Sequence, residues 1–135
     1  MTPRENQDRL VAVLRFIEDP QERLAFIQDR TRKQAPLPEA FRTETHRIRG
    51  CVTRVWLRST WDGTVCTFEV DSESSMVRGL AALVAEVYSG CSPEKVAEFS
   101  CTLLEDAGLD RIITPTRLQG LAHLQTAIRQ CKFEP

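Results

Sequence analysis

The sequence turns from loop to strand at Arg47-Ile48-Arg49-Gly50-Cys51-Val52-Thr53-Arg54-Val55-Trp56-Leu57, and a cysteine directly follows a glycine in this segment. Arg47, Arg49 and Arg54 flank Cys51. Nearby cations favour the thiolate, which is the nucleophilic form of cysteine. Gly50 can adopt a positive φ or allow a partner backbone to approach closely. The segment therefore indicates a reactive thiol. The alternative is a small buried cysteine beside arginines on a solvated face.

The residues after this segment alternate as in a β-hairpin. Apolar side chains at every second position mark a strand that begins at about Val55, and Asp62-Gly63 supplies the turn. In the return strand Cys66 shares one face with Phe68, so Cys66 is expected in the core. A short strand over 46–49 is expected to complete a three-stranded antiparallel sheet.

Capping residues and helical periodicity predict helices on both sides of the hairpin. The predicted helices cover residues 6–18, 20–33, 75–89, a start at 93, 102–107 and a last helix from 115. Gly79 lies in the apolar face of the 75–89 helix and is expected to pack closely on a strand. Residues 35–46 form a long loop that leads to Cys51, and such loops are often functional. We therefore expect an α+β fold, a small three-stranded antiparallel sheet flanked by helices.

The composition fits an ordinary folded domain. The chain has 135 residues, and we expect one domain over residues 1–135. The net charge is −1, which gives no global basic field for nucleic acid or an anionic membrane. The N-terminus lacks a signal-peptide pattern, and no apolar run reaches membrane-spanning length. A cytoplasmic location without nucleic-acid or membrane partners is therefore expected.

The cysteines and histidines form no recognisable metal or disulfide pattern. The five cysteines are odd in number, widely spaced and without a CxxC pair, so neither a disulfide framework nor a Cys/His metal site is expected. His46 and His123 carry no hydrolase signature with Cys51. A phosphate-binding glycine loop, a dinucleotide fingerprint and a GxSxG elbow are also absent. Either one thiol does chemistry, or all five are structural.

Three groups of residues follow a recognisable order and spacing over most of the chain. The first group is Pro36-Leu37-Pro38, Phe41-Arg42-Thr43-Glu44, Arg47, Gly50-Cys51 and Val55-Trp56. The second is Asp71-Ser72 with Met76-Val77-Arg78-Gly79-Leu80, and the third is Thr114-Pro115-Thr116-Arg117 with Gly120-Leu121. Together with Glu22-Arg23 in the second helix, they resemble the SufE family of sulfur-acceptor proteins.

This resemblance implies a persulfide relay. A pyridoxal-phosphate-dependent cysteine desulfurase of the SufS or CsdA type removes sulfur from cysteine. A SufE-like partner stimulates it, accepts the sulfur on a cysteine that corresponds to Cys51, and passes it to a SufB-like iron–sulfur scaffold. Asp71 and Arg117 match positions on the functional surface near the acceptor, with Gly50 and Arg47 as further supporting residues.

The resemblance also implies a SufE/NifU-like fold with a three-stranded sheet. It implies a sulfur carrier rather than an enzyme. No bound cofactor is implied for this chain, because pyridoxal phosphate belongs to the desulfurase. A monomer and a homodimer both remain compatible with the sequence.

The chain departs from the family pattern around Cys51. Val52 and Arg54 replace amide residues, and Arg49 replaces a proline that would stiffen the loop. The two added arginines are expected to favour the thiolate. The sulfur can instead feed tRNA or cofactor thiolation. Two alternatives come from other classes: a thiol-based redox protein, with Cys66 as the only near resolving cysteine, and a non-covalent desulfurase adaptor.

Overall fold

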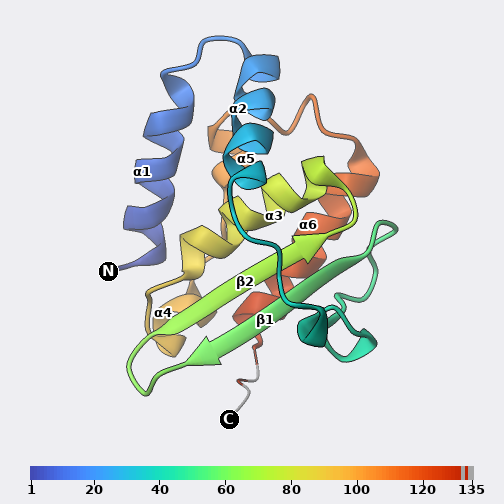
Figure 1. Ribbon diagram of the computed structural model, residues 1–135. Coiled ribbons are helices and arrows are strands. Elements are labelled where there is room, and N and C mark those ends of the chain that lie inside the picture. Colours follow the sequence, from blue (N-terminus) through green and yellow to red (C-terminus); the bar gives the residue numbers. More distant parts are fainter. Residues whose placement is uncertain (132, 134–135) are drawn as a thin grey trace.

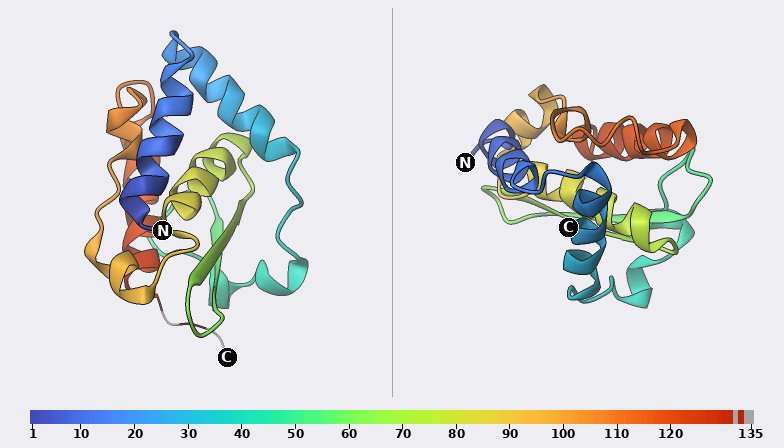
Figure 2. Two further views of the ribbon diagram at one scale, coloured as in Figure 1. Left: turned by 90° about the vertical axis from the view of Figure 1, so that its left-hand side faces the viewer. Right: turned by 90° about the horizontal axis from the view of Figure 1, so that it is seen from above.

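The computed structural model describes residues 1–131 and 133, and its helices pack around a β-hairpin (Figure 1). In chain order the elements are α1 (Pro3–Arg15), α2 (Pro20–Arg32), η1 (Glu39–Phe41), η2 (Glu44–His46), β1 (Val55–Trp61), β2 (Cys66–Ser72), α3 (Ser75–Tyr88), α4 (Pro93–Glu98), α5 (Leu103–Asp106) and α6 (Pro115–Arg129). Figure 2 shows α3 against one face of the sheet, with α1, α2 and α6 around α3. The segment between α2 and β1 passes over the opposite face. The fold is therefore α+β, as predicted.

Local capping interactions fix where the long helices begin. Thr2, Asp19, Ser74 and Thr114 precede α1, α2, α3 and α6, and each side chain accepts a backbone N–H of the first turn. A proline opens three of these helices, where its missing N–H costs no helical hydrogen bond. Across the described ranges 1–131 and 133, none of the helices is both long and apolar enough to cross a bilayer.

The sheet has two strands among the described residues, and the prediction of three was wrong. β1 and β2 pair antiparallel along their full length. The expected third strand is reduced to one bridge between Arg47 and Trp56, beside which the Ile48 N–H donates to the Val55 carbonyl at 2.8 Å. Gly50 follows with φ 84°, in the left-handed region. A strand does not continue through that backbone angle, so pairing ends after one bridge.

The helix α3 is covered by the sheet on one side and by α2 on another. Gly79 faces α2: a side-chain carbon there would lie 2.9 Å from Ile27 Cγ2 and 3.3 Å from Thr31 Oγ1. The expected contact between Gly79 and a strand was therefore wrong. The glycine instead allows the close approach of two helices.

A buried arginine ties α1, α2 and α5 together. Arg23 on α2 is 8% exposed, and its Nε donates to the carbonyls of Leu14 at 3.1 Å and Ile17 at 2.7 Å. Its Nη1 donates to the Ala107 carbonyl at 2.7 Å. Carbonyls at helix C-termini lack intrahelical partners, and a buried charge needs hydrogen bonds. The single guanidinium meets both requirements.

Candidate functional site

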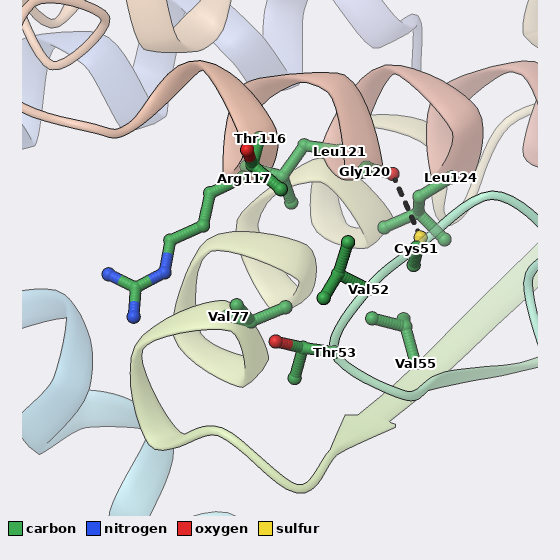
Figure 3. Close-up of a pocket in the computed structure, with 10 residues that line it drawn as sticks. All are labelled: Cys51, Val52, Thr53, Val55, Val77, Thr116, Arg117, Gly120, Leu121 and Leu124. Atoms are coloured by element: carbon green, nitrogen blue, oxygen red, sulfur yellow. Dashed lines mark hydrogen bonds between the residues drawn. The ribbon is translucent and has the colours of Figure 1, made fainter.

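Cys51 lies where the loop before β1 meets α6 (Figure 3). Its side chain is half-buried, and the thiol donates to the Gly120 carbonyl, with 3.4 Å between sulfur and oxygen. Gly120 lies in close packing with this side chain, because a carbon added there would be in van der Waals contact with Cys51 Sγ at 3.4 Å and Cys51 Cβ at 3.8 Å. The thiol is thus held against the helix rather than in solvent.

The backbone angle at position 50 requires a glycine, and the ring of His123 lies against it. The φ of 84° lies in the left-handed region, which residues with side chains rarely adopt. A side-chain carbon on Gly50 would also lie 2.8 Å from Cδ2 and 2.9 Å from Nε2 of His123. The imidazole of His123, on α6, therefore occupies the space next to the Gly50 backbone.

A mainly apolar pocket of about 30 Å³ opens beside Cys51 (Figure 3). The other lining residues come from the loop, the start of β1, α3 and α6: Val52, Thr53, Val55, Val77, Thr116, Arg117, Gly120, Leu121 and Leu124. A space of this size holds at least one water-sized group. Val52 is 81% exposed, so the loop also presents an apolar side chain to solvent directly beside the thiol.

Burial and charge act on the acidity of Cys51 in opposite directions. Burial is the larger effect and raises the pKa of the thiol, because the thiolate loses hydration, while the charge of Arg47 lowers that pKa in part. Arg49 is exposed, and Arg54 binds Glu73 with an Nη2–Oε2 distance of 3.0 Å. The expected lowering of the Cys51 pKa is therefore wrong for this conformation. Docked on α6, Cys51 carries less thiolate than a free cysteine at the same pH.

Asp71 does not line the pocket. It is 3% exposed, accepts the Leu37 N–H at 3.1 Å, and pairs with Arg78 at 3.4 Å and Arg42 at 3.7 Å. These contacts hold the segment between α2 and β1 against the sheet. Asp71 therefore anchors the segment of the chain that leads to Cys51, rather than lining the pocket itself.

Arg117 lines the pocket from the first turn of α6. Its Nη1 lies 3.0 Å from Met76 Sδ on α3, and Figure 3 shows the guanidinium extending away from Cys51. Of the four supporting residues predicted from the sequence, Gly50, Arg47 and Arg117 lie at the loop or its pocket. The fourth, Asp71, anchors the segment between α2 and β1.

Cys66, Cys91 and Cys101 are less suited to reaction than Cys51, and Cys131 is half-buried like Cys51. Cys66 is fully buried, which confirms its predicted core position, and burial raises its pKa to about 11. Cys91 is also buried and forms a backbone bridge with Cys66. Burial raises the pKa of Cys101 to about 11 and raises that of Cys131 as well. Within residues 1–131 and 133, no three His, Cys, Asp or Glu side chains are grouped to hold a metal ion.

The contact between His123 and Gly50 was not predicted from the sequence. Arg117, Gly120 and His123 are spaced by three residues, so they project from neighbouring positions on one face of α6. In the sequence, this spacing was the one feature that linked His123 to the predicted site residue Arg117. His46, the histidine nearer in sequence, packs edge-on to the ring of Phe41 at 5.4 Å.

The fold and the site together define a small α+β protein that holds one thiol between a loop and a helix. The chain belongs to the SufE family, described as an Fe-S metabolism associated domain, which matches residues 8–131. The family match confirms the resemblance seen in the sequence motifs.

Individual relatives are distant but cover most of the chain. An uncharacterized SufE-like protein of Rhizobium meliloti is 26% identical over 132 residues, covering 94% of this chain and 92% of that protein. The SufE-like protein 1 of Arabidopsis thaliana, named as chloroplastic/mitochondrial, is 26% identical over 116 residues. That match covers 85% of this chain but only 31% of the plant protein. The cytoplasmic location expected for this chain stays a prediction.

The fold has a counterpart among solved structures. A hypothetical protein from Thermus thermophilus, solved in solution, superposes with a TM-score of 0.76 at 21% sequence identity. The superposition covers 96% of this chain and 93% of the other. It supports the α+β architecture described above.

Proposed function

We propose that this protein is a sulfur acceptor that receives persulfide sulfur on Cys51 from a cysteine desulfurase of the SufS or CsdA type. It stimulates the desulfurase and delivers the sulfur to a SufB-like iron–sulfur scaffold. The observation that carries the proposal is the half-buried Cys51, held at the Gly120 carbonyl beside a small pocket in a SufE-family chain. The protein acts as a carrier rather than an enzyme, and pyridoxal phosphate is bound by the desulfurase.

Sulfur transfer follows the chemistry of thiol–disulfide exchange. The Cys51 thiolate attacks the outer sulfur of the donor persulfide, and an S–S bond forms at Cys51 Sγ. The donor S–S bond breaks, and the donor cysteine leaves as a thiolate that takes up the proton lost by Cys51. No electron is gained or lost overall. Delivery repeats the step with a nucleophile of the recipient.

Two positions of the loop meet the different needs of storage and transfer. Docked on α6, Cys51 has a raised pKa, and a sulfur added to it can enter the pocket between Val55, Leu121 and Leu124. Released from α6, the thiol regains hydration, which lowers its pKa while Arg47 stays on the same segment. If iodoacetamide labels Cys51 no faster with the desulfurase present than without it, release by the desulfurase is wrong.

The supporting residues take separate roles in this proposal. Arg47 favours the thiolate through its charge, as the direction of its effect on the Cys51 pKa indicates. Arg117 lines the pocket, and its guanidinium, which extends away from Cys51, offers a cation to the docked desulfurase. Asp71 anchors the segment that carries the loop, through Leu37.

Intact-protein mass spectrometry without reductant tests the assignment. After incubation with cysteine and a SufS- or CsdA-type desulfurase, the protein should gain sulfur on the peptide that contains Cys51. Cys51→Ser should gain none, while Cys131→Ser is the control and should gain sulfur like the wild type. No added sulfur with several desulfurases, or sulfur spread over all five cysteines, would overturn the proposal.

The same variants separate the alternatives. A thiol peroxidase would consume hydrogen peroxide in a Cys51-dependent manner, but the buried Cys66, with its pKa of about 11, is a poor resolving thiol. A non-covalent adaptor would still stimulate the desulfurase as Cys51→Ala. Delivery of labelled sulfur from loaded protein to an iron–sulfur scaffold, compared with a tRNA or cofactor thiolation enzyme, identifies the recipient.

A further inference from the structure

The acceptor loop, residues 49–53, contacts α6 at two points. The Cys51 thiol donates to the Gly120 carbonyl and packs beside Gly120. The imidazole of His123 lies against Gly50, in the space that a side chain at position 50 would need. Gly120 and His123 are three residues apart and therefore lie on one face of the helix.

We propose that His123 is a positioning residue that fastens the acceptor loop to α6 and limits how often Cys51 leaves its pocket. The consequence for sulfur transfer rests on the function proposed above. His123 is exposed to solvent, so the hydrophobic core does not account for its contact with Gly50. The other attachment, between Cys51 and the Gly120 carbonyl, is a weak S–H···O contact of 3.4 Å. A second point of attachment therefore contributes materially to holding the loop.

The shape of the imidazole suits this role. A flat ring can lie on a backbone that lacks a side chain, and it then covers the peptide groups next to Cys51. When the loop lifts from α6, the ring contact and the thiol contact are lost together. Removing the ring should therefore favour the open loop without unfolding the core, since loops open locally at a smaller free energy than the whole domain.

The rate of iodoacetamide labelling at Cys51, measured by peptide mass mapping on the protein alone, reports this opening. His123→Ala should label about three- to tenfold faster than the wild type. His123→Phe keeps a flat ring and should stay within about twofold of the wild-type rate. Thr126→Ala, about one turn further along α6, is the control and should label at the wild-type rate.

Three outcomes would overturn the proposal. The first is a His123→Ala rate within about twofold of the wild type. The second is an equal acceleration in Thr126→Ala, and the third is His123→Phe labelling as fast as His123→Ala. Thermal melts should match the wild type for all three variants, because the substituted side chains are exposed.

A double-mutant cycle tests whether His123 acts through Gly50. Gly50→Ala places a carbon where the ring lies and should itself speed the labelling of Cys51. Adding His123→Ala to Gly50→Ala should then change the rate little, whereas fully additive effects would overturn the proposal. The labelling uses no desulfurase. A wild-type protein that gains no sulfur would refute the proposed function and leave the role of His123 standing.

Discussion

Replacing Arg23 by methionine removes three hydrogen bonds to backbone carbonyls and keeps much of the side-chain volume. Hydrogen bonds from a charged donor contribute about 1.5–3 kcal/mol each. Two of the three share the Nε–H, which reaches the carbonyls of Leu14 and Ile17, so the sum is smaller than three full bonds. The Leu14 carbonyl keeps the N–H of Ile17 at 3.1 Å, whereas the carbonyls of Ile17 and Ala107 lose the guanidinium, that of Ala107 in buried surroundings. We therefore expect Arg23→Met to lower the free energy of unfolding by about 3–5 kcal/mol.

Urea unfolding followed by circular dichroism measures this loss as a shift of the midpoint at an unchanged slope. Arg15→Met is the matched control, because Arg15 is exposed and donates one bond, from Nε to the Asp106 carbonyl at 2.8 Å. Arg15→Met should lower the free energy of unfolding by about 1 kcal/mol or less. Arg23→Lys keeps the charge but not the several N–H donors of the guanidinium, so its loss of stability should be intermediate between those of Arg15→Met and Arg23→Met. If Arg23→Met loses no more stability than Arg15→Met, the reasoning about the buried guanidinium is wrong.

Three further predictions concern the loop, its anchor and the core. The reaction of Cys51 with iodoacetamide should have a pH midpoint above that of a free cysteine, because burial raises the pKa of the thiol, and Arg47→Ala should raise this midpoint further. Labelling rates measured by peptide mapping over a range of pH test this. A midpoint below that of free cysteine would contradict it. Asp71→Asn should lower the free energy of unfolding by about 1–3 kcal/mol, because it weakens two ion pairs at a buried site. Glu73→Gln, in an exposed ion pair, should lower it less, and equal losses in urea unfolding would count against the role given to burial. Tyr88→Phe should lower the free energy of unfolding by about 1–2 kcal/mol, because the buried hydroxyl donates to the Phe99 carbonyl at 2.7 Å and accepts the Cys101 N–H at 3.2 Å. An unchanged thermal midpoint would show that these hydrogen bonds contribute nothing to stability.

Local signals were sufficient to predict the hairpin and the starts of α2, α3 and α6, whereas α1 begins at Pro3 and not at the predicted residue 6. At the predicted turn, Asp62 Oδ1 accepts the N–H groups of Thr64 at 2.8 Å and Val65 at 2.9 Å. Asp19 caps α2 in the same way, through the N–H of Gln21. These interactions join residues close in sequence, so the residue types and their spacing carry the information.

The errors concern contacts between distant segments. The pattern over 46–49 favours a strand, but the backbone angle of Gly50, next to His123 on α6, ends the pairing. Neighbouring arginines predicted a lowered pKa for Cys51, but burial of the thiol beside Gly120, 69 residues away, raises it. Helical spacing places His123 on a face with Gly120, but it does not reveal which segment that face meets. Tertiary packing decides each of these features, and local patterns do not record it.

The apolar lining of the pocket beside Cys51 has a consequence for the lifetime of a bound sulfur. The pocket, of about 30 Å³, holds at least one water-sized group, and its walls include Val55, Leu121 and Leu124. In the proposed relay, the outer sulfur of a persulfide on Cys51 enters this space while the loop is docked. Soluble thiols would then reach the sulfur more slowly than after the loop has lifted, so the survival of the persulfide between partners would follow the rate of loop opening.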